Sequence, residues 1–190
     1  MNKHQQAVLE FHNAMDVVVG SEPGLRDTEL RLNLIEEEAA EAAEALRDGI
    51  DIVHVVHELC DVLYVTYGAA VAFGVDLVPS TADAVRRAEP GVHQGDWLAS
   101  LVERAAAAAA AAIRAGDLDG SVEGLDALAS AAYLAAAHCG VEINPCFDEM
   151  HASQMTRAGG EVREDGKRLK PPTYRQPDLA PIIAKMGRVA

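Results

Sequence analysis

Carboxylate side chains gather in two short stretches of the sequence, LIEEEAAE and HELCD, and twenty residues separate Glu38 from Glu58. On a helix each residue advances about 100°, so Glu38 and Glu41 would lie roughly 60° apart, with Glu37 only some 40° from Glu41. Glu58 and Asp61 have the same i, i+3 spacing in the second stretch. The spacing therefore predicts two acidic groups, each on one face of a helix.

The second pair has strongly apolar neighbours, which include Val55, Leu59 and Val62. Buried carboxylates at such density must be protonated or paired with cations. Oxygen ligands from two facing helices, with room left for water and substrate oxygens, suit Mg²⁺ or Mn²⁺. Taken alone, LIEEEAAEAAEAL could also be a solvated acidic helix face without a ligand. The second pair favours the metal site.

Helical periodicity predicts the elements that position these acids. Aromatic residues make up only 4% of the chain and alanine is abundant, so an all-α fold is expected, with no strand before residue 160. One helix should run from an N-cap at Asp27 to Gly49, and the next from about Asp51 to Gly74. A short turn at Gly49 would make the two helices antiparallel neighbours and bring the acidic groups together.

The other helices are expected at about 3–19, with Val18 on the apolar face, between the prolines at 79 and 90, and at 97–116, 121–140 and from 144 on. From Arg157 the chain is polar, rich in glycine and proline, and locally basic. This composition indicates a loop or short hairpin, closed by a small helix from about Asp178 to Met186. A disordered terminus is the alternative for such a segment.

Size, charge and cysteine usage bound the class of protein. With 190 residues and 49% hydrophobic content, a single domain over 1–190 is expected. The net charge of −14 disfavours a nucleic-acid partner. Cys60, Cys139 and Cys146 lack close spacing, which suits a reducing, cytoplasmic setting, and Cys60 is expected to be a small buried residue. The longest weakly polar run is fourteen residues long, below the roughly 20 that span a bilayer, so no membrane is expected.

Two motifs carry a family resemblance: R-x-x-L-I-x-E-E-x-x-E at 31–41 and E-L-x-D-x-L-Y-V at 58–65. Together with F-D-E-M-H-A-S-Q-M-T-R and D-G-K-R-L-K-P near the C-terminus, they resemble the all-α nucleoside triphosphate pyrophosphohydrolases of the MazG-like superfamily, especially the branch of MazG-like dUTP pyrophosphatases. The matching segments cover about half of the chain. The resemblance implies a four-helix-type bundle and hydrolysis of a nucleoside triphosphate, with dUTP as the expected substrate, to the monophosphate and pyrophosphate.

The resemblance also implies roles for particular residues. The metal ligands for Mg²⁺, with Mn²⁺ as a substitute, would be Glu38, Glu41, Glu58 and Asp61. Glu37 would be a further ligand or the base, and Glu37 or Glu41 would accept the proton of the attacking water. His54 and His57 are expected to support the acids rather than to bind the metal.

The C-terminal half is expected to supply the groups that bind the substrate: His151, Gln154, Arg157, Lys167, Lys170 and Tyr174. Lys167 and Lys170 would contact the triphosphate, and Tyr174 would lie near the base or sugar. The family pattern H-x-x-N-x-x-K stands here as His151, Gln154 and Arg157. Gln154 offers the same amide one methylene further out, and Arg157 keeps a positive charge.

The middle of the chain resembles its beginning. LVERAAAAAAAAIRAG aligns with LIEEEAAEAAEALRDG at an offset of 67, and at an offset of 66 Tyr133, Gly140 and Pro145 match Tyr67, Gly74 and Pro79. These matches indicate a degenerate duplication, with repeat 1 at about 27–90, repeat 2 at about 96–157 and a tail at 158–190. The alternative is a chance alignment of alanine-rich helices. Repeat 2 lacks the acids, so a fused pseudo-dimer with one site per chain is expected, either as a monomer or as a homodimer.

Two functions from other classes compete with this hypothesis. A carboxylate-bridged di-iron or di-manganese bundle usually needs Glu-x-x-His, which the sequence does not contain. A non-catalytic helical module would use the acidic stripe to contact a basic partner. Trp97 is expected to be a core or staple residue at the start of its helix, not a platform for a base.

Overall fold

The computed structural model describes residues 1–80, 94–164 and 166–186, and these residues confirm the predicted all-α fold. Its longer helices are α1 (Lys3–Ala14), α2 (Thr28–Asp48), α3 (Ile52–Phe73), α5 (Gln94–Ala115), α6 (Leu118–His138) and α7 (Ile143–Gln154). A 3₁₀ turn, η1 (Met155–Arg157), and a short helix, α8 (Ala180–Lys185), follow. The expected hairpin is reduced to one isolated antiparallel bridge between Val162 and Arg168.

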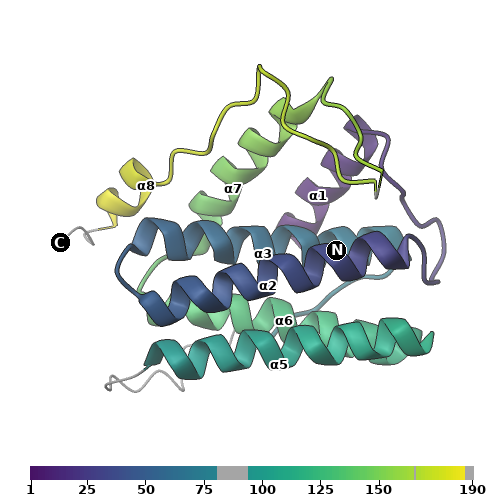
Figure 1. Cartoon of the computed structure of the whole chain (residues 1–190), viewed down its shortest axis with the longest axis horizontal. Helices are drawn as coiled ribbons and strands as arrows, with labels where there is room; N and C mark the ends of the chain where they lie inside the picture. Colours follow the sequence, from purple (N-terminus) through teal and green to yellow (C-terminus); the bar gives the residue numbers. More distant parts are fainter. Residues whose placement is uncertain (81–93, 165, 187–190) are drawn as a thin grey trace.

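Helices α2, α3, α5 and α6 form a four-helix bundle. Figure 1 shows α2 and α3 lying over α5 and α6, with α1 and α7 on the opposite side of α3. Helix α3 is therefore covered from several directions, which matches its almost continuous apolar sequence. It is long and apolar enough to cross a membrane, but 83% of its apolar window is buried inside the protein. Its composition is explained by its central position.

The ends of α2 and α3 show how the predicted turn is built. Gly49 and Gly74 both adopt the left-handed conformation that ends a helix, with φ values of 59° and 69°. Asp51 caps α3 by accepting hydrogen bonds from the backbone of Val53 and His54. Asp27 precedes α2 as predicted, but it makes no side-chain cap bond, and its carboxylate lies 3.6 Å from Arg31 instead.

Several predicted boundaries are wrong. Helix α1 ends at Ala14 because Asp16 has a positive φ of 55°, so Val18 lies outside the helix and is 38% exposed. Helix α5 is already helical at residue 94, and α6, capped by Asp117, begins at Leu118, three residues before the predicted start. Helix α7 begins at Ile143, one residue before the predicted start, and Glu142 precedes it at the N-cap position. The small C-terminal helix is shorter than expected. The helix predicted between the two prolines falls largely on residues 81–93, outside the described residues.

Trp97 also differs from its prediction. Its side chain is 41% exposed and packs edge-on against His138, so it is neither a core residue nor a buried staple. Cys60 is fully buried, as predicted.

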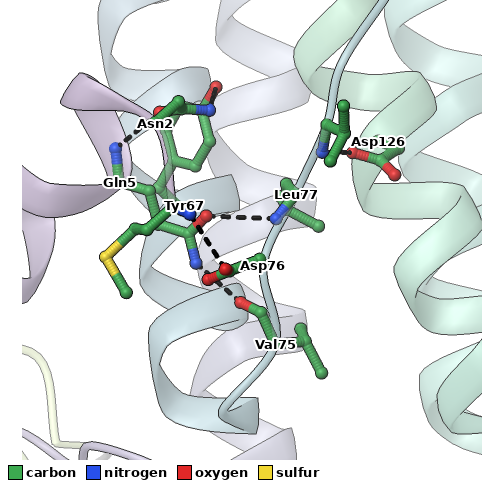
Figure 2. Close-up of polar contacts among 9 residues, drawn as sticks. Asn2, Gln5, Tyr67, Val75, Asp76, Leu77 and Asp126 are labelled. Atoms are coloured by element: carbon green, nitrogen blue, oxygen red, sulfur yellow. Dashed lines mark hydrogen bonds and ion pairs between the residues drawn. The ribbon is translucent and has the colours of Figure 1, made fainter.

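The connection after α3 is held by side chains of α1 and α6 (Figure 2). Gln5 donates to the carbonyl of Val75 at 2.6 Å and accepts from the backbone N–H of Leu77 at 3.1 Å. Asp126 on α6 accepts from the backbone of Val78 at 2.8 Å. These bonds satisfy backbone groups of a segment without regular structure, and they tie α1 and α6 to the end of α3.

The two helix pairs have matching features at a constant spacing. Asp51 and Asp117 cap α3 and α6, and Gly74 and Gly140 take left-handed conformations after these helices. The hydroxyls of Tyr67 and Tyr133 lie 2.8 Å apart where α3 contacts α6. Of these matched positions, Tyr67 and Tyr133 are in direct contact between α3 and α6.

A substitution at Gly124 can test how closely α6 packs against α5. A Cβ atom at this position would lie 2.5 Å from the Cα of Ala109, a contact that the backbone cannot relieve locally. We expect Gly124→Ala to lower the free energy of unfolding by about 1–3 kcal/mol, although alanine is the better helix former. Urea denaturation measures this change. Glu123→Ala, at an exposed neighbouring position, is the control, and an unchanged stability of Gly124→Ala would contradict the close contact.

Candidate active site

The acidic residues of α2 and α3 face each other in an antiparallel register. In this register Glu38 lies opposite Asp61, and Glu41 lies opposite Glu58. The two pairs agree with each other because, in antiparallel helices, the numbers of two opposing residues always have the same sum. Glu38, Glu58 and Asp61 each place a carboxylate oxygen within 4.8 Å of the other two. Together these three residues are termed the carboxylate cluster below.

Burial and mutual repulsion define the electrostatics of the cluster. Glu58 is 7% exposed and the side chain of Glu38 is 12% exposed. Desolvation raises the pKa of Glu38 to about 7, and the nearby carboxylate of Asp61 adds to this effect, whereas Lys167 opposes it. Desolvation also raises the pKa of Glu58. The site therefore holds more negative charge than its own cations compensate.

Two histidines contact the cluster from one turn earlier on α3. Nδ1 of His54 lies 3.3 Å from Glu58, and Nε2 of His57 lies 3.3 Å from Asp61. The hydrogen bond to Asp61 raises the pKa of His57. Both histidines thus orient carboxylates of the cluster.

The C-terminal tail supplies a cation to the cluster. Nζ of Lys167 lies 2.9 Å from Glu37 and 3.6 Å from Glu38, although more than a hundred residues separate them in sequence. Glu37 is exposed at the rim of the site, and Glu41 lines the same cavity without joining the three-carboxylate cluster. The tail is thus an ordered part of the site in the described residues, not a disordered terminus.

The predicted substrate-binding residues divide into two groups. Gln154, Arg157, Lys167 and Lys170 line the cavity, and Gln154 donates to Asp61 at 3.4 Å. His151 and Tyr174 do not line it. His151 faces Tyr64 at 3.1 Å and Glu10 at 3.5 Å, so it packs behind the wall of the cavity.

Tyr174 has a different position from the one predicted near the base or sugar. Its ring lies under two cations, 4.9 Å from Nζ of Lys170 and 5.5 Å from the guanidinium carbon of Arg157. Its hydroxyl accepts a hydrogen bond from Ser153. Tyr174 therefore positions two basic side chains by cation–π contacts.

The cavity that contains the cluster has a volume of about 690 Å³ and extends well beyond the acids. One wall is apolar and aromatic and includes Phe11, Leu34, Tyr64 and Val65. Another is basic and includes Arg163 and Arg168 of the tail. The sequence motifs gave no role to Phe11, His12, Arg31 or Tyr64, but Arg31 stands seven residues before Glu38, a spacing that keeps both on one helix face.

The donor set fits a hard divalent cation. Three carboxylates converge, two of them with pKa values raised by burial, and the cavity leaves room for water and phosphate oxygens. A bound cation would remove the repulsion that disfavours their ionised forms. Glu38, Glu58 and Asp61 would hold it, and Glu41 lies on the adjacent turn.

The comparisons with known proteins agree with this chemistry. Residues 9–89 match the family model of phosphoribosyl-ATP pyrophosphohydrolase, a family of the MazG-like superfamily of nucleotide pyrophosphohydrolases. The matched region contains α2, α3 and all residues of the carboxylate cluster. No curated protein sequence matches the chain significantly. The prediction of a hydrolase that acts on phosphoanhydride bonds of nucleotides is thereby confirmed.

The raised pKa of Glu38 predicts the pH dependence of stability without metal. The folded pKa of about 7 exceeds the usual 4.5, so the contribution of this group to stability is fully present below pH 4.5 and is lost as the pH rises through 7. This single group would contribute a loss of up to about 3 kcal/mol between these pH values.

We expect Glu38→Gln to remove much of this loss. The measurement is the free energy of unfolding in chelator at pH 5 and pH 8, for wild type and variant. Glu44→Gln, at an exposed position of α2, is the matched control. Equal pH dependence in wild type and Glu38→Gln would show that Glu38 is not the strained carboxylate.

Proposed function

We propose that the protein is a Mg²⁺-dependent nucleoside triphosphate pyrophosphohydrolase that releases a nucleoside monophosphate and pyrophosphate. The observation that carries this proposal is the partly buried cluster of Glu38, Glu58 and Asp61 in a cavity whose lining also includes basic side chains of the tail. Carboxylates that hold metal ions and cations that hold phosphate oxygens are the two requirements of phosphoanhydride hydrolysis.

Each part of the cavity has a distinct task. Mg²⁺, when bound, would neutralise phosphate charge and lower the pKa of a nearby water. Lys167, Lys170 and Arg157 reach the cavity from the tail and from η1, where they can contact phosphate oxygens. Glu37 and Glu41 border the cluster and are the candidates to accept the proton of the attacking water.

Lys167 has a second task when no metal is bound. Its ammonium group lies against Glu37 and Glu38 and partly compensates their charge. A metal ion would compete for the two carboxylates, and a phosphate group of the substrate would compete for the ammonium group. The contact therefore holds the tail over the cavity until Lys167 binds phosphate instead.

The substrate within this class is proposed from two different resemblances. The C-terminal D-G-K-R-L-K-P segment supports dUTP, because it is similar to the branch of MazG-like dUTP pyrophosphatases. The family match of residues 9–89 is named for phosphoribosyl-ATP. Both substrates would release pyrophosphate, and a test of the function must include both.

We also propose that α5 and α6 are a degenerate copy of α2 and α3, so that one chain contains one site. Matching caps at Asp51 and Asp117 and the contact between Tyr67 and Tyr133 support this duplication. The positions that correspond to Glu58 and Asp61 are Gly124 and Ala127, which offer no ligands. Isothermal titration should accordingly give one nucleotide per chain.

The decisive experiment is product analysis with a panel of nucleoside triphosphates and phosphoribosyl-ATP in Mg²⁺. We expect monophosphate and pyrophosphate from a subset of substrates. In Glu38→Ala and Asp61→Asn, kcat/KM should fall by at least about 100-fold, because the metal loses a carboxylate ligand and the charge of the phosphates is then not neutralised. Glu44→Gln is the control on the exposed face of α2.

The alternatives make different predictions for the same experiment. A non-catalytic module would release no product from any substrate, although the protein is folded and metal is present. A carboxylate-bridged redox bundle would bind iron tightly and stoichiometrically. Turnover that survives in folded Glu38→Ala would remove the carboxylate cluster from the active site.

A further inference from the structure

Arg31 is a buried cation that the chemistry above does not use. Its side chain is only 4% exposed, and its Nε and one terminal nitrogen have no hydrogen-bond partner among the described residues. The partly exposed Asp27 forms an ion pair with one terminal nitrogen at 3.6 Å, longer than an ordinary hydrogen bond, and so compensates the charge of Arg31 only in part. Leaving a buried guanidinium in this state is costly, so a ligand with hydrogen-bond acceptors would stabilise it.

His12 lies beside this guanidinium. A terminal nitrogen of Arg31 and Nε2 of His12 both approach Gly68 on α3, where a Cβ atom would lie 3.2 Å from the first and 3.4 Å from the second. Nδ1 of His12 lies 2.8 Å from the carbonyl oxygen of Val18 and therefore carries a proton. Burial and the charge of Arg31 lower the pKa of His12 to about 4, so Nε2 is an unprotonated acceptor at neutral pH.

These two side chains lie at a fixed distance from the carboxylate cluster. On α2, Arg31 lies seven residues from Glu38, and on α3, Gly68, which Arg31 and His12 approach, lies seven residues from Asp61. Seven residues correspond to about 10 Å along a helix. Arg31 and His12 line the same cavity as the cluster. A nucleotide whose phosphates lie at the cluster would extend its sugar and base in this direction.

The part of the cavity between the carboxylate cluster and Arg31 has the composition to bind a flat base. Phe11, Leu34, Tyr64 and Val65 form an apolar and aromatic wall of the cavity. Lys167, Lys170 and Arg157 supply cations near the acids, so Arg31 is not needed there for the triphosphate. Arg31 and His12 present a donor and an acceptor side by side, a pattern that reads the edge of a base.

We propose that Arg31 and His12 form the base-reading end of the site and select bases with an adjacent carbonyl and ring N–H. Arg31 would donate to the carbonyl oxygen, and Nε2 of His12 would accept from the ring N–H. Uracil, thymine and guanine offer this edge, whereas cytosine and adenine offer an amino group and an unprotonated ring nitrogen. This inference rests on the proposed nucleotide substrate, and it assigns specificity to residues outside the carboxylate motifs.

The test is the binding of nucleoside monophosphates, which does not depend on hydrolysis. We expect the wild type to bind dUMP at least about tenfold more tightly than dCMP, since a mismatched edge leaves buried polar groups unpaired. Arg31→Gln should reduce this ratio to below about threefold. Arg31→Lys keeps the charge and a donor but not the planar group, and should give an intermediate ratio.

Controls separate base reading from a merely structural role. Thermal melting establishes that each variant is folded, and Arg104→Gln, an exposed change on α5, should leave the ratio unchanged. An unchanged ratio in folded Arg31→Gln or Arg31→Lys, a wild-type preference for dCMP, or no binding of any monophosphate would overturn the proposal. Failure of the proposed hydrolysis appears separately, as absence of pyrophosphate from every triphosphate while the binding preference persists.

Discussion

The crowding of carboxylates between α2 and α3 is the constraint on which the rest of the structure depends. Glu38, Glu58 and Asp61 are held within 4.8 Å of one another by a bundle that also shields them partly from water. Folding alone compensates this charge only in part, as the raised pKa of Glu38 shows. The surrounding groups are best understood as partial compensation: His54 and His57 from within α3, Gln154 from α7 and Lys167 from the tail. Full compensation requires a ligand, and a divalent cation with a phosphate chain meets that requirement.

The antiparallel register of α2 and α3 connects the charged end of the cavity to its other end. Because both helices rise at the same rate, the pairing of Glu38 with Asp61 also places Arg31 opposite Gly68. The lack of a side chain at Gly68 leaves space for Arg31 from α2 and His12 from α1 to meet. A single helical interface thus carries two chemically different sites along one groove, and the chain needs no separate domain for the base.

The sequence allowed the helical architecture and the acidic cluster to be predicted because both depend on local periodicity. The positions of Glu38, Glu58 and Asp61 follow from i, i+3 spacing on helices joined by a tight turn at Gly49. Contacts that depend on tertiary packing could not be predicted in this way. Tyr174 was expected at the nucleotide but lies under Lys170 and Arg157, and His151 packs against Tyr64. Arg31 was part of a recognised motif, yet only its burial and missing partners indicate that it has a ligand.

The second helix pair shows in physical terms why an active site needs space as well as acids. Gly124 of α6 packs directly on the backbone of Ala109, closer than any side chain would permit. The corresponding position in the first pair is Glu58, whose carboxylate requires a cavity in front of it. An acidic side chain at position 124 would therefore force α5 and α6 apart and disturb the packing between them. The alanine residues of α5 and Gly124 of α6 allow these two helices to pack closely. This apolar packing stabilises the bundle while α2 and α3 hold mutually repelling carboxylates in the cavity.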